Sequence, residues 1–168
     1  MFRIRRIHDD ALPVNREAIG QVQTILREQF PDAPAKDVDG LARKLRDPFR
    51  QRFRAILHVA ENRDGRVQGC AIALHEPQLR MSWLDYIAAR ARLTSRGIGG
   101  ALYQRVREEA SAFGARALFF ECLPDDPTHC RDASLLAANR ARLRFYEGYG
   151  ARPAVDNDYT APLDDDSD

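Results

Sequence analysis

The sequence lacks an excess of charge of either sign and any long apolar run. It has 26 basic and 25 acidic residues in 168, so its net charge of +1 gives no reason to expect a nucleic-acid or membrane partner. No stretch approaches the roughly 18 consecutive apolar residues of a membrane-spanning helix. A chain of this length predicts one compact domain, residues 1–163, with an acidic tail at 164–168 that we expect to be disordered.

Cysteine is scarce as well, and it does not form the paired spacing of a zinc site. Cys122, His129 and Cys130 lie close together in the sequence. The chain has no second pair of cysteine or histidine residues to complete a ligand set, so we expect no bound metal. The first residues, 1–4, lack the apolar run of a secretion signal, which favours a cytoplasmic location.

Of the ten glycines, three occur together at Gly97, Gly99 and Gly100. They open a predicted amphipathic helix, in which apolar residues such as Leu102 and Val106 recur at three- and four-residue steps. Each glycine costs a helix about 1 kcal/mol relative to alanine, so something must approach this backbone closely. A phosphate or pyrophosphate would use the unpaired N–H groups of the helix N-terminus. A turn that only lets a strand and a helix pack closely is the alternative.

Two common nucleotide-binding motifs do not fit these glycines. A dinucleotide-binding turn needs a third small residue where this chain has Leu102. It also belongs to a first strand–helix unit, whereas residues 66–89 are predicted to form a strand meander. A P-loop needs Gly-Lys-Ser/Thr, which does not follow the glycines.

The segment from Leu84 to Leu102 resembles the acyl-CoA signature of the GNAT superfamily of N-acyltransferases. In that family a strand leads through a loop of the pattern Gln/Arg-x-x-Gly-x-Gly/Ala into a helix whose N-terminal amides hold the CoA pyrophosphate. Arg96-Gly97-Ile98-Gly99 match the last four positions, and Thr94 stands where glutamine or arginine is usual. The resemblance implies that acetyl-CoA is the co-substrate and that a backbone N–H near Ile87 or Ala89 polarises its carbonyl group.

A second segment, Asn139 to Ala151, resembles the other GNAT signature, in which asparagine precedes Phe/Leu-Tyr-Glu and a glycine turn. Asn139 and Tyr146 are seven residues apart, so a helix would bring them to one face within about 20°. The resemblance implies that Asn139 holds the pantetheine arm and that Tyr146 protonates the departing thiolate. The full set expected to bind acetyl-CoA is Ile87, Ala88, Ala89, Thr94, Ser95, Arg96, Gly97, Ile98, Gly99, Gly100, Ala101, Asn139 and Tyr146.

Apolar periodicity, prolines and turn residues predict the order of elements. We expect a strand at 2–7, a helix from Pro13 to before Pro31, a helix at 38–46, strands at 53–61, 67–74 and 82–89, the glycine helix, a strand at 117–123, a helix carrying Asn139, and short strands at 152–155 and near Tyr159. This order predicts an α/β fold of the GNAT type, an α+β mixed sheet. In such a fold a mostly antiparallel sheet with one splayed parallel pair is flanked by about four helices.

Two carboxylates are candidates for the general base. Asp85 lies on the strand that leads to the glycines and Glu121 on its predicted parallel neighbour, and we prefer Asp85 narrowly. A solvated or ion-paired carboxylate is the alternative for both.

The function predicted is transfer of an acetyl group from acetyl-CoA to a primary amine of a small molecule or peptide, by direct transfer in a ternary complex. A non-catalytic acyl-CoA-binding or regulatory module of a larger protein is the rival interpretation. A homodimer stays open as the oligomeric state.

Overall fold

The computed structural model describes residues 1–47, 50, 52–90, 97–128, 130 and 132–154. Its contacts divide the chain into two compact units, Met1–Glu121 and Cys122–Asp168. The sheet and four of the helices belong to the first unit, and one helix belongs to the second. The expected single domain over residues 1–163 stays a prediction.

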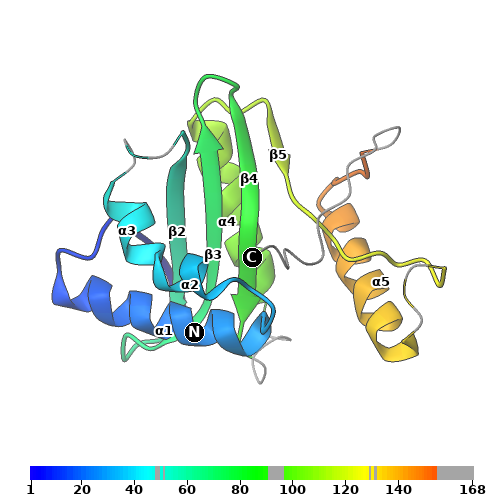
Figure 1. Ribbon diagram of the computed structural model, residues 1–168, viewed down its shortest axis with the longest axis horizontal. Helices are drawn as coiled ribbons and strands as arrows, with labels where there is room; N and C mark the ends of the chain where they lie inside the picture. Colours follow the sequence, from blue (N-terminus) through cyan, green and yellow to red (C-terminus); the bar gives the residue numbers. More distant parts are fainter. Residues whose placement is uncertain (48–49, 51, 91–96, 129, 131, 155–168) are drawn as a thin grey trace, which may run out of the picture. The chain divides into compact units, whose positions relative to one another are not determined.

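One five-stranded sheet forms the centre of the first unit, with its strands side by side in chain order (Figure 1). The strands are β1 (Arg3–Ile7), β2 (Arg54–Glu61), β3 (Val67–Glu76), β4 (Met81–Ala89) and β5 (Ala117–Phe119). Strands β1 to β4 pair antiparallel, and β5 pairs parallel to β4 after the crossover through a helix. The predicted mixed sheet with one parallel pair is confirmed.

Helices cover both faces of this sheet. Figure 1 shows α1 (Pro13–Gln29), α2 (Ala35–Asp39) and α3 (Leu41–Arg46) in front of the strands and α4 (Ile98–Ala112) behind them. The main apolar core lies under the first three helices, because their buried residues pack against those of β2 and β3. Helix α4 buries its own stripe, which consists of Ile98, Leu102, Tyr103, Val106 and Ala110. The predicted amphipathic helix is confirmed.

Three predicted elements differ from the structure. The helix expected at 38–46 is two helices joined at Gly40, where an added Cβ would lie 2.7 Å from the Lys36 carbonyl oxygen. The strand expected at 117–123 ends at Phe119, where its pairing with β4 ends. Residues 152–154 form no strand, and the segment near Tyr159 and the acidic tail lie outside the described residues.

The second unit contains α5 (Ala133–Gly148), which begins well before Asn139. Asp132 precedes the helix, and its Oδ1 accepts hydrogen bonds from the backbone N–H groups of Ser134 at 2.8 Å and Leu135 at 3.1 Å. This side-chain cap satisfies two of the four N–H groups that a helix leaves unpaired at its start, and it fixes where α5 begins.

A buried histidine lies between the sheet and α4. His58 of β2 is fully buried, and its Nε2 lies 3.5 Å from Oε2 of Glu109. Within the part of the chain that the structure describes, neither ring nitrogen makes a hydrogen bond. Burial lowers the pKa of His58 to about 4, with a contribution from Arg105 and Arg6, while the Glu109 carboxylate acts in the opposite direction. The imidazole is therefore neutral at pH 7.

We expect His58 to make the protein acid-sensitive. The unfolded chain takes up this proton near pH 6.5 and the folded chain only near pH 4, so stability that is present above pH 6.5 is lost as the pH falls toward 4. The loss should be about 1–3 kcal/mol, and urea unfolding at pH 7 and 4.5 would measure it. In His58→Leu, or in His58→Gln if that variant does not fold, the difference should shrink. An equal pH dependence in wild type and variant would contradict the assignment.

Candidate active site

The parallel pair of strands separates after a short contact. Strand β5 pairs with β4 through Met81–Ala117, Ser82–Leu118 and Trp83–Phe119. Beyond these pairs β4 continues to Ala89, and the described residues give it no strand partner on that side. Among the described residues the edge of β4 from Leu84 onward thus has no strand partner, and such an edge presents backbone N–H and C=O groups for pairing. The predicted splay of this pair agrees with the register.

A β-bulge lies in β4 just beyond the point of separation. In the pairing of β3 with β4, Ile72 lies opposite Tyr86 and Ala73 lies opposite Leu84, so Asp85 is the extra residue. Bulges bend a strand and redirect the side chain at that position, and they are frequent next to active sites. Asp85 is thus placed by the backbone itself at the start of the free edge.

The side chain of Asp85 is half-buried, and its carboxylate has no hydrogen bond from any described residue. Burial raises the pKa of Asp85 to about 6, the nearby charge of Lys44 lowers it, and the charges of Asp37 and Glu121 raise it. Lys44 and Asp37 form an ion pair of 2.9 Å between α3 and α2. A carboxylate with a pKa near 6 is ionised at neutral pH and is a stronger base than an ordinary aspartate.

Glu121, the second candidate base, lies two residues after β5 and is exposed. It interacts electrostatically with Asp85, so the structure brings the two carboxylates into one region of the first unit. Their surroundings differ, because Asp85 is half-buried whereas Glu121 is exposed. This difference favours Asp85 as the base and leaves Glu121 as a neighbouring negative charge.

The sequence did not point to the groups that surround Asp85 on the side of α1 to α3. Besides the ion pair of Asp37 and Lys44, Tyr86 packs edge-to-face on Phe30 with ring centroids 5.2 Å apart. Burial and the charges of Asp85 and Asp37 raise the pKa of Tyr86, which keeps its hydroxyl protonated. Charge and aromatic patterns carry no signal for these contacts, because the contacts depend on where two short helices pack.

Helix α4 begins at the glycines. Gly97 is the N-cap, with a φ of 73° that favours glycine, and its carbonyl accepts the first helical hydrogen bond, from Ala101 N at 3.0 Å. The N–H groups of Ile98, Gly99 and Gly100 precede that bond, so the helix gives them no partner. A Cβ added to Gly97 or Gly99 would meet no described atom within 4 Å. Close packing against the described residues therefore does not explain these glycines. The positive φ explains glycine at Gly97, and the space beside Gly99 is compatible with a bound anion.

The remaining residues of the expected binding set lie on either side of this turn. Ile87, Ala88 and Ala89 form the end of β4, where they pair with Ala71, Cys70 and Gly69 of β3. Ala88 is buried in the core, and the other two are half-buried. Thr94, Ser95 and Arg96 lie outside the described residues.

Asn139 and Tyr146 are the two buried residues of α5, in agreement with the shared helix face that their spacing predicts. The side-chain amide of Asn139 donates to the carbonyl oxygen of Pro124 at 2.9 Å. It thus holds the segment before the helix against α5. Tyr146 packs edge-to-face with Phe145 at 5.1 Å. Because both belong to the second unit, their predicted roles toward acetyl-CoA stay predictions.

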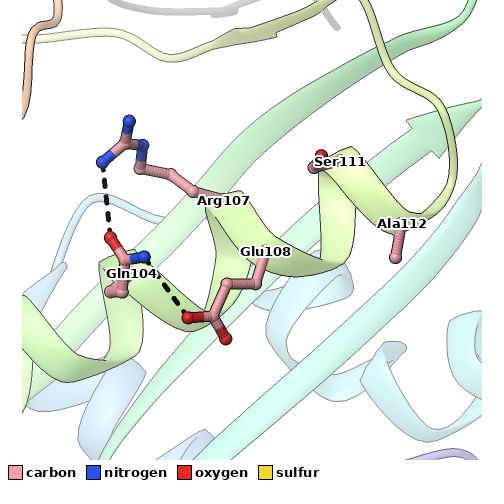
Figure 2. Close-up of a pocket in the computed structure, with 5 residues that line it drawn as sticks. All are labelled: Gln104, Arg107, Glu108, Ser111 and Ala112. Atoms are coloured by element: carbon pink, nitrogen blue, oxygen red, sulfur yellow. Dashed lines mark hydrogen bonds between the residues drawn. The ribbon is translucent and has the colours of Figure 1, made fainter.

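A surface hollow lies elsewhere, along the exposed side of α4 (Figure 2). It is lined by Gln104, Arg107, Glu108, Ser111 and Ala112. Figure 2 shows that its polar groups bond to one another, since Arg107 donates to Gln104 and Gln104 donates to Glu108, each at 3.3 Å. The hollow is separate from the helix N-terminus, and we do not place the active site there.

None of the described helices combines the length and apolar character needed to cross a membrane. No group of three or more histidine, cysteine, aspartate or glutamate side chains among the described residues is arranged to hold a metal ion.

Residues 19–150 match the model of the acetyltransferase (GNAT) family, so the chain belongs to this family of acyl-transferring enzymes. Members of the family use acetyl-CoA. No curated protein sequence matches the chain.

Solved structures with the same fold have low sequence identity to this chain. AAC(6')-Iy in complex with the bisubstrate analogue CoA-S-monomethyl-acetylneamine has a TM-score of 0.67 and 13% identity, covering 96% of this chain and 98% of that one. An aminoglycoside acetyltransferase from an uncultured soil metagenomic sample, in complex with sisomicin, has a TM-score of 0.65 and 16% identity, covering 96% of both chains. The ribosomal-protein-alanine N-acetyltransferase of Brucella melitensis biovar Abortus 2308 has a TM-score of 0.61 and 20% identity, covering 96% and 99%.

The space above Gly99 can be tested directly. Gly99→Ala should raise the free energy of unfolding by up to about 1 kcal/mol, because alanine is the better helix former and no described atom blocks its methyl group. The same methyl group should lower the affinity for acetyl-CoA about tenfold or more by holding the pyrophosphate away. Calorimetry measures the change in acetyl-CoA affinity, and urea unfolding measures the change in stability.

Gly20→Ala, in the open middle of α1, is the matched control and should change stability only. Unchanged acetyl-CoA affinity in Gly99→Ala would refute a close anion.

Proposed function

We propose that this protein is an N-acetyltransferase that moves the acetyl group of acetyl-CoA directly to a primary amine within a ternary complex. The observation that carries the proposal is the half-buried side chain of Asp85, without a hydrogen bond from any described residue, at the bulge of β4. This strand leads from the separated parallel pair to the open N-terminus of α4. The proposal thus takes its base, its anion site and its strand edge from one unit of the structure.

Asp85 acts as the general base in this proposal. An aliphatic amine reaches the enzyme as an ammonium ion and must lose a proton before its nitrogen can attack. An ionised Asp85 accepts this proton, directly or through a water molecule. Because no described donor satisfies the carboxylate, its lone pairs are available to the acceptor. The charge of Lys44 keeps the pKa from rising further, so that Asp85 is ionised at neutral pH.

Acetyl-CoA is held along β4 and α4. The first-turn amides of α4 bind the pyrophosphate, and the free edge of β4 near Ile87 and Ala89 supplies a backbone N–H to polarise the thioester carbonyl. The nitrogen then forms a bond to the carbonyl carbon as the carbon–sulfur bond breaks. The Tyr146 hydroxyl donates its proton to the departing thiolate, and Asn139 supports the pantetheine arm.

A cationic amine suits the charges around Asp85. Asp37 and Glu121 add negative charge in its neighbourhood, and Lys44 is the positive charge that acts on Asp85 from the described residues. The similar structures include proteins named for aminoglycosides and for a ribosomal-protein alanine, which supports testing both small cationic amines and peptide N-termini. Thiol release from acetyl-CoA with aminoglycosides, polyamines, amino acids and peptides would identify the acceptor. Binding of acetyl-CoA without thiol release from any of them would favour the non-catalytic module.

Replacing the base should remove the pH dependence together with the activity. For the wild type we expect kcat/KM to fall below about pH 6, where Asp85 becomes protonated. Asp85→Asn should lower kcat/KM by about 10²-fold or more at pH 7.5 and abolish that acidic limb. Glu121→Gln is the rival variant. A larger loss in Glu121→Gln than in Asp85→Asn would exchange the two roles.

The same variant, Asp85→Asn, should be more stable than the wild type at pH 7.5 although its kcat/KM is lower. A loss of activity through unfolding would not give this combination. The folded-state pKa of Asp85, about 6, lies above the ordinary aspartate value of 3.8, so the carboxyl group stabilises the fold below pH 3.8 and this contribution is lost as the pH rises through 6. An asparagine side chain does not ionise, so Asp85→Asn loses no stability in this pH range. It should therefore resist urea better than the wild type at pH 7.5 and about equally at pH 4.

Removing the hydroxyl group of Tyr146 tests whether this residue donates a proton or only packs. Tyr146→Phe should keep the ring contact with Phe145 and the acetyl-CoA affinity, yet lower kcat by about 10²-fold. A loss under threefold in a chemistry-limited kcat would contradict the role. Asn139→Ala is the paired variant and should raise the KM for acetyl-CoA more than it lowers kcat. Its unfolding should be measured alongside, because it also loses the bond to Pro124.

A further inference from the structure

Gly69 lies in β3 at the point where three segments of the first unit meet. A Cβ built on Gly69 would lie 2.8 Å from the carbonyl oxygen of Ala88, 2.8 Å from Cγ2 of Ile98 and 3.3 Å from Cα of Ala89. Two of these distances are well below ordinary van der Waals contact. No other residue type fits here unless a neighbour moves, and one of the closest neighbours is backbone.

The neighbours of Gly69 belong to the two segments that the proposed function assigns to acetyl-CoA. Ala88 and Ala89 end β4, whose free edge faces the thioester in that proposal. Ile98 is the first residue of α4, where the pyrophosphate is expected, and its side chain is buried. Both the end of β4 and the start of α4 therefore pack against Gly69.

The end of β4 is itself fixed to β3 beside Gly69. The backbone N–H of Arg90 donates to the Gln68 carbonyl oxygen at 2.9 Å, and Nε of Arg90 donates to the Val67 carbonyl oxygen, also at 2.9 Å. With β4 held in this way, the contact between Ile98 and Gly69 sets how far the first turn of α4 lies from β4. A side chain at position 69 would push one of them away.

We propose that Gly69 is a positioning residue that sets the spacing between the acyl end and the pyrophosphate end of the acetyl-CoA site. This inference rests on the proposed function. A ligand that is held at both ends tolerates little change in the distance between its two binding segments, because each set of hydrogen bonds fixes the other. Gly69 touches neither end of the ligand and acts through the backbone that it supports.

The decisive variant is Gly69→Ala, compared with wild type by calorimetry with acetyl-CoA and by steady-state kinetics. Displacement of the α4 amides or of the β4 edge should lower acetyl-CoA affinity about tenfold or more, since charge-assisted hydrogen bonds depend steeply on geometry. The double variant Gly69→Ala/Ile98→Leu removes the branched methyl group at Cγ2 while keeping the side-chain size. It should recover part of the lost affinity, because one of the two close contacts is then relieved.

A matched core variant separates positioning from general destabilisation. Val22→Ala removes a fully buried side chain of α1 from the core under α1 to α3, and Val22 takes no part in the site. It should lower stability by urea unfolding and leave acetyl-CoA affinity within twofold of wild type. Gly69→Ala should lose affinity well beyond Val22→Ala even where the two are equally destabilised.

The outcomes also separate this inference from the function on which it rests. If the wild type binds no acetyl-CoA, the proposed function fails. If the wild type binds acetyl-CoA and Gly69→Ala binds it equally well, or loses no more affinity than an equally destabilised Val22→Ala, the positioning role of Gly69 is overturned. If Gly69→Ala does not fold, Gly69→Ala/Ile98→Leu takes its place. Its close contact with the Ala88 carbonyl oxygen remains, so it should still bind acetyl-CoA more weakly than wild type, and equal affinity would overturn the positioning role.

Discussion

The early separation of β4 from β5 is the constraint on which the candidate site depends. Parallel strands normally continue side by side, but here the pairing ends at Trp83 and Phe119 while β4 runs on to Ala89. The remaining edge of β4 carries backbone groups that must be satisfied by something other than β5. The bulge at Asp85 follows at once and places a carboxylate where that free edge begins. The proposed base and the proposed ligand edge thus follow from two neighbouring departures from regular sheet geometry, the early end of the parallel pairing and the bulge.

Burial acts on two ionisable groups of the sheet with opposite consequences. Desolvation always disfavours the charged form, so it raises the pKa of the Asp85 carboxyl group and lowers that of the His58 imidazole. At neutral pH His58 is uncharged and compatible with the packing of α4. Asp85 is then charged, and its ionisation costs folding free energy that a purely structural residue would not need. Such a cost at a bulge beside a free strand edge is typical of a functional group.

The sequence predicted the fold well where elements are long and periodic, and the site only in outline. Helix α4 and strands β2, β3 and β4 follow from apolar spacing and turn residues, because both are local signals. The break at Gly40 and the early end of β5 depend on tertiary packing, so periodicity alone placed both wrongly. Asp85 was a candidate from its position in the chain. Its bulge, its neighbour Lys44 and the exposed state of Glu121 depend on strand register and helix placement, which no local pattern encodes.

Glycines near the end of β4 and the start of α4 have different physical reasons for being glycine. Glycines at 97 and 99 admit either a bound anion or close packing as the reason for their presence, and the sequence cannot choose between them. Among the described residues no atom lies near a Cβ built on either glycine, so packing against those residues does not explain them, whereas Gly69 has the short contacts that packing requires. Close approach of strand and helix does occur in this protein, and it is provided by β3. Among the described residues, the close packing of α4 on the sheet is thus provided by Gly69 of β3 and not by the glycines at the helix start.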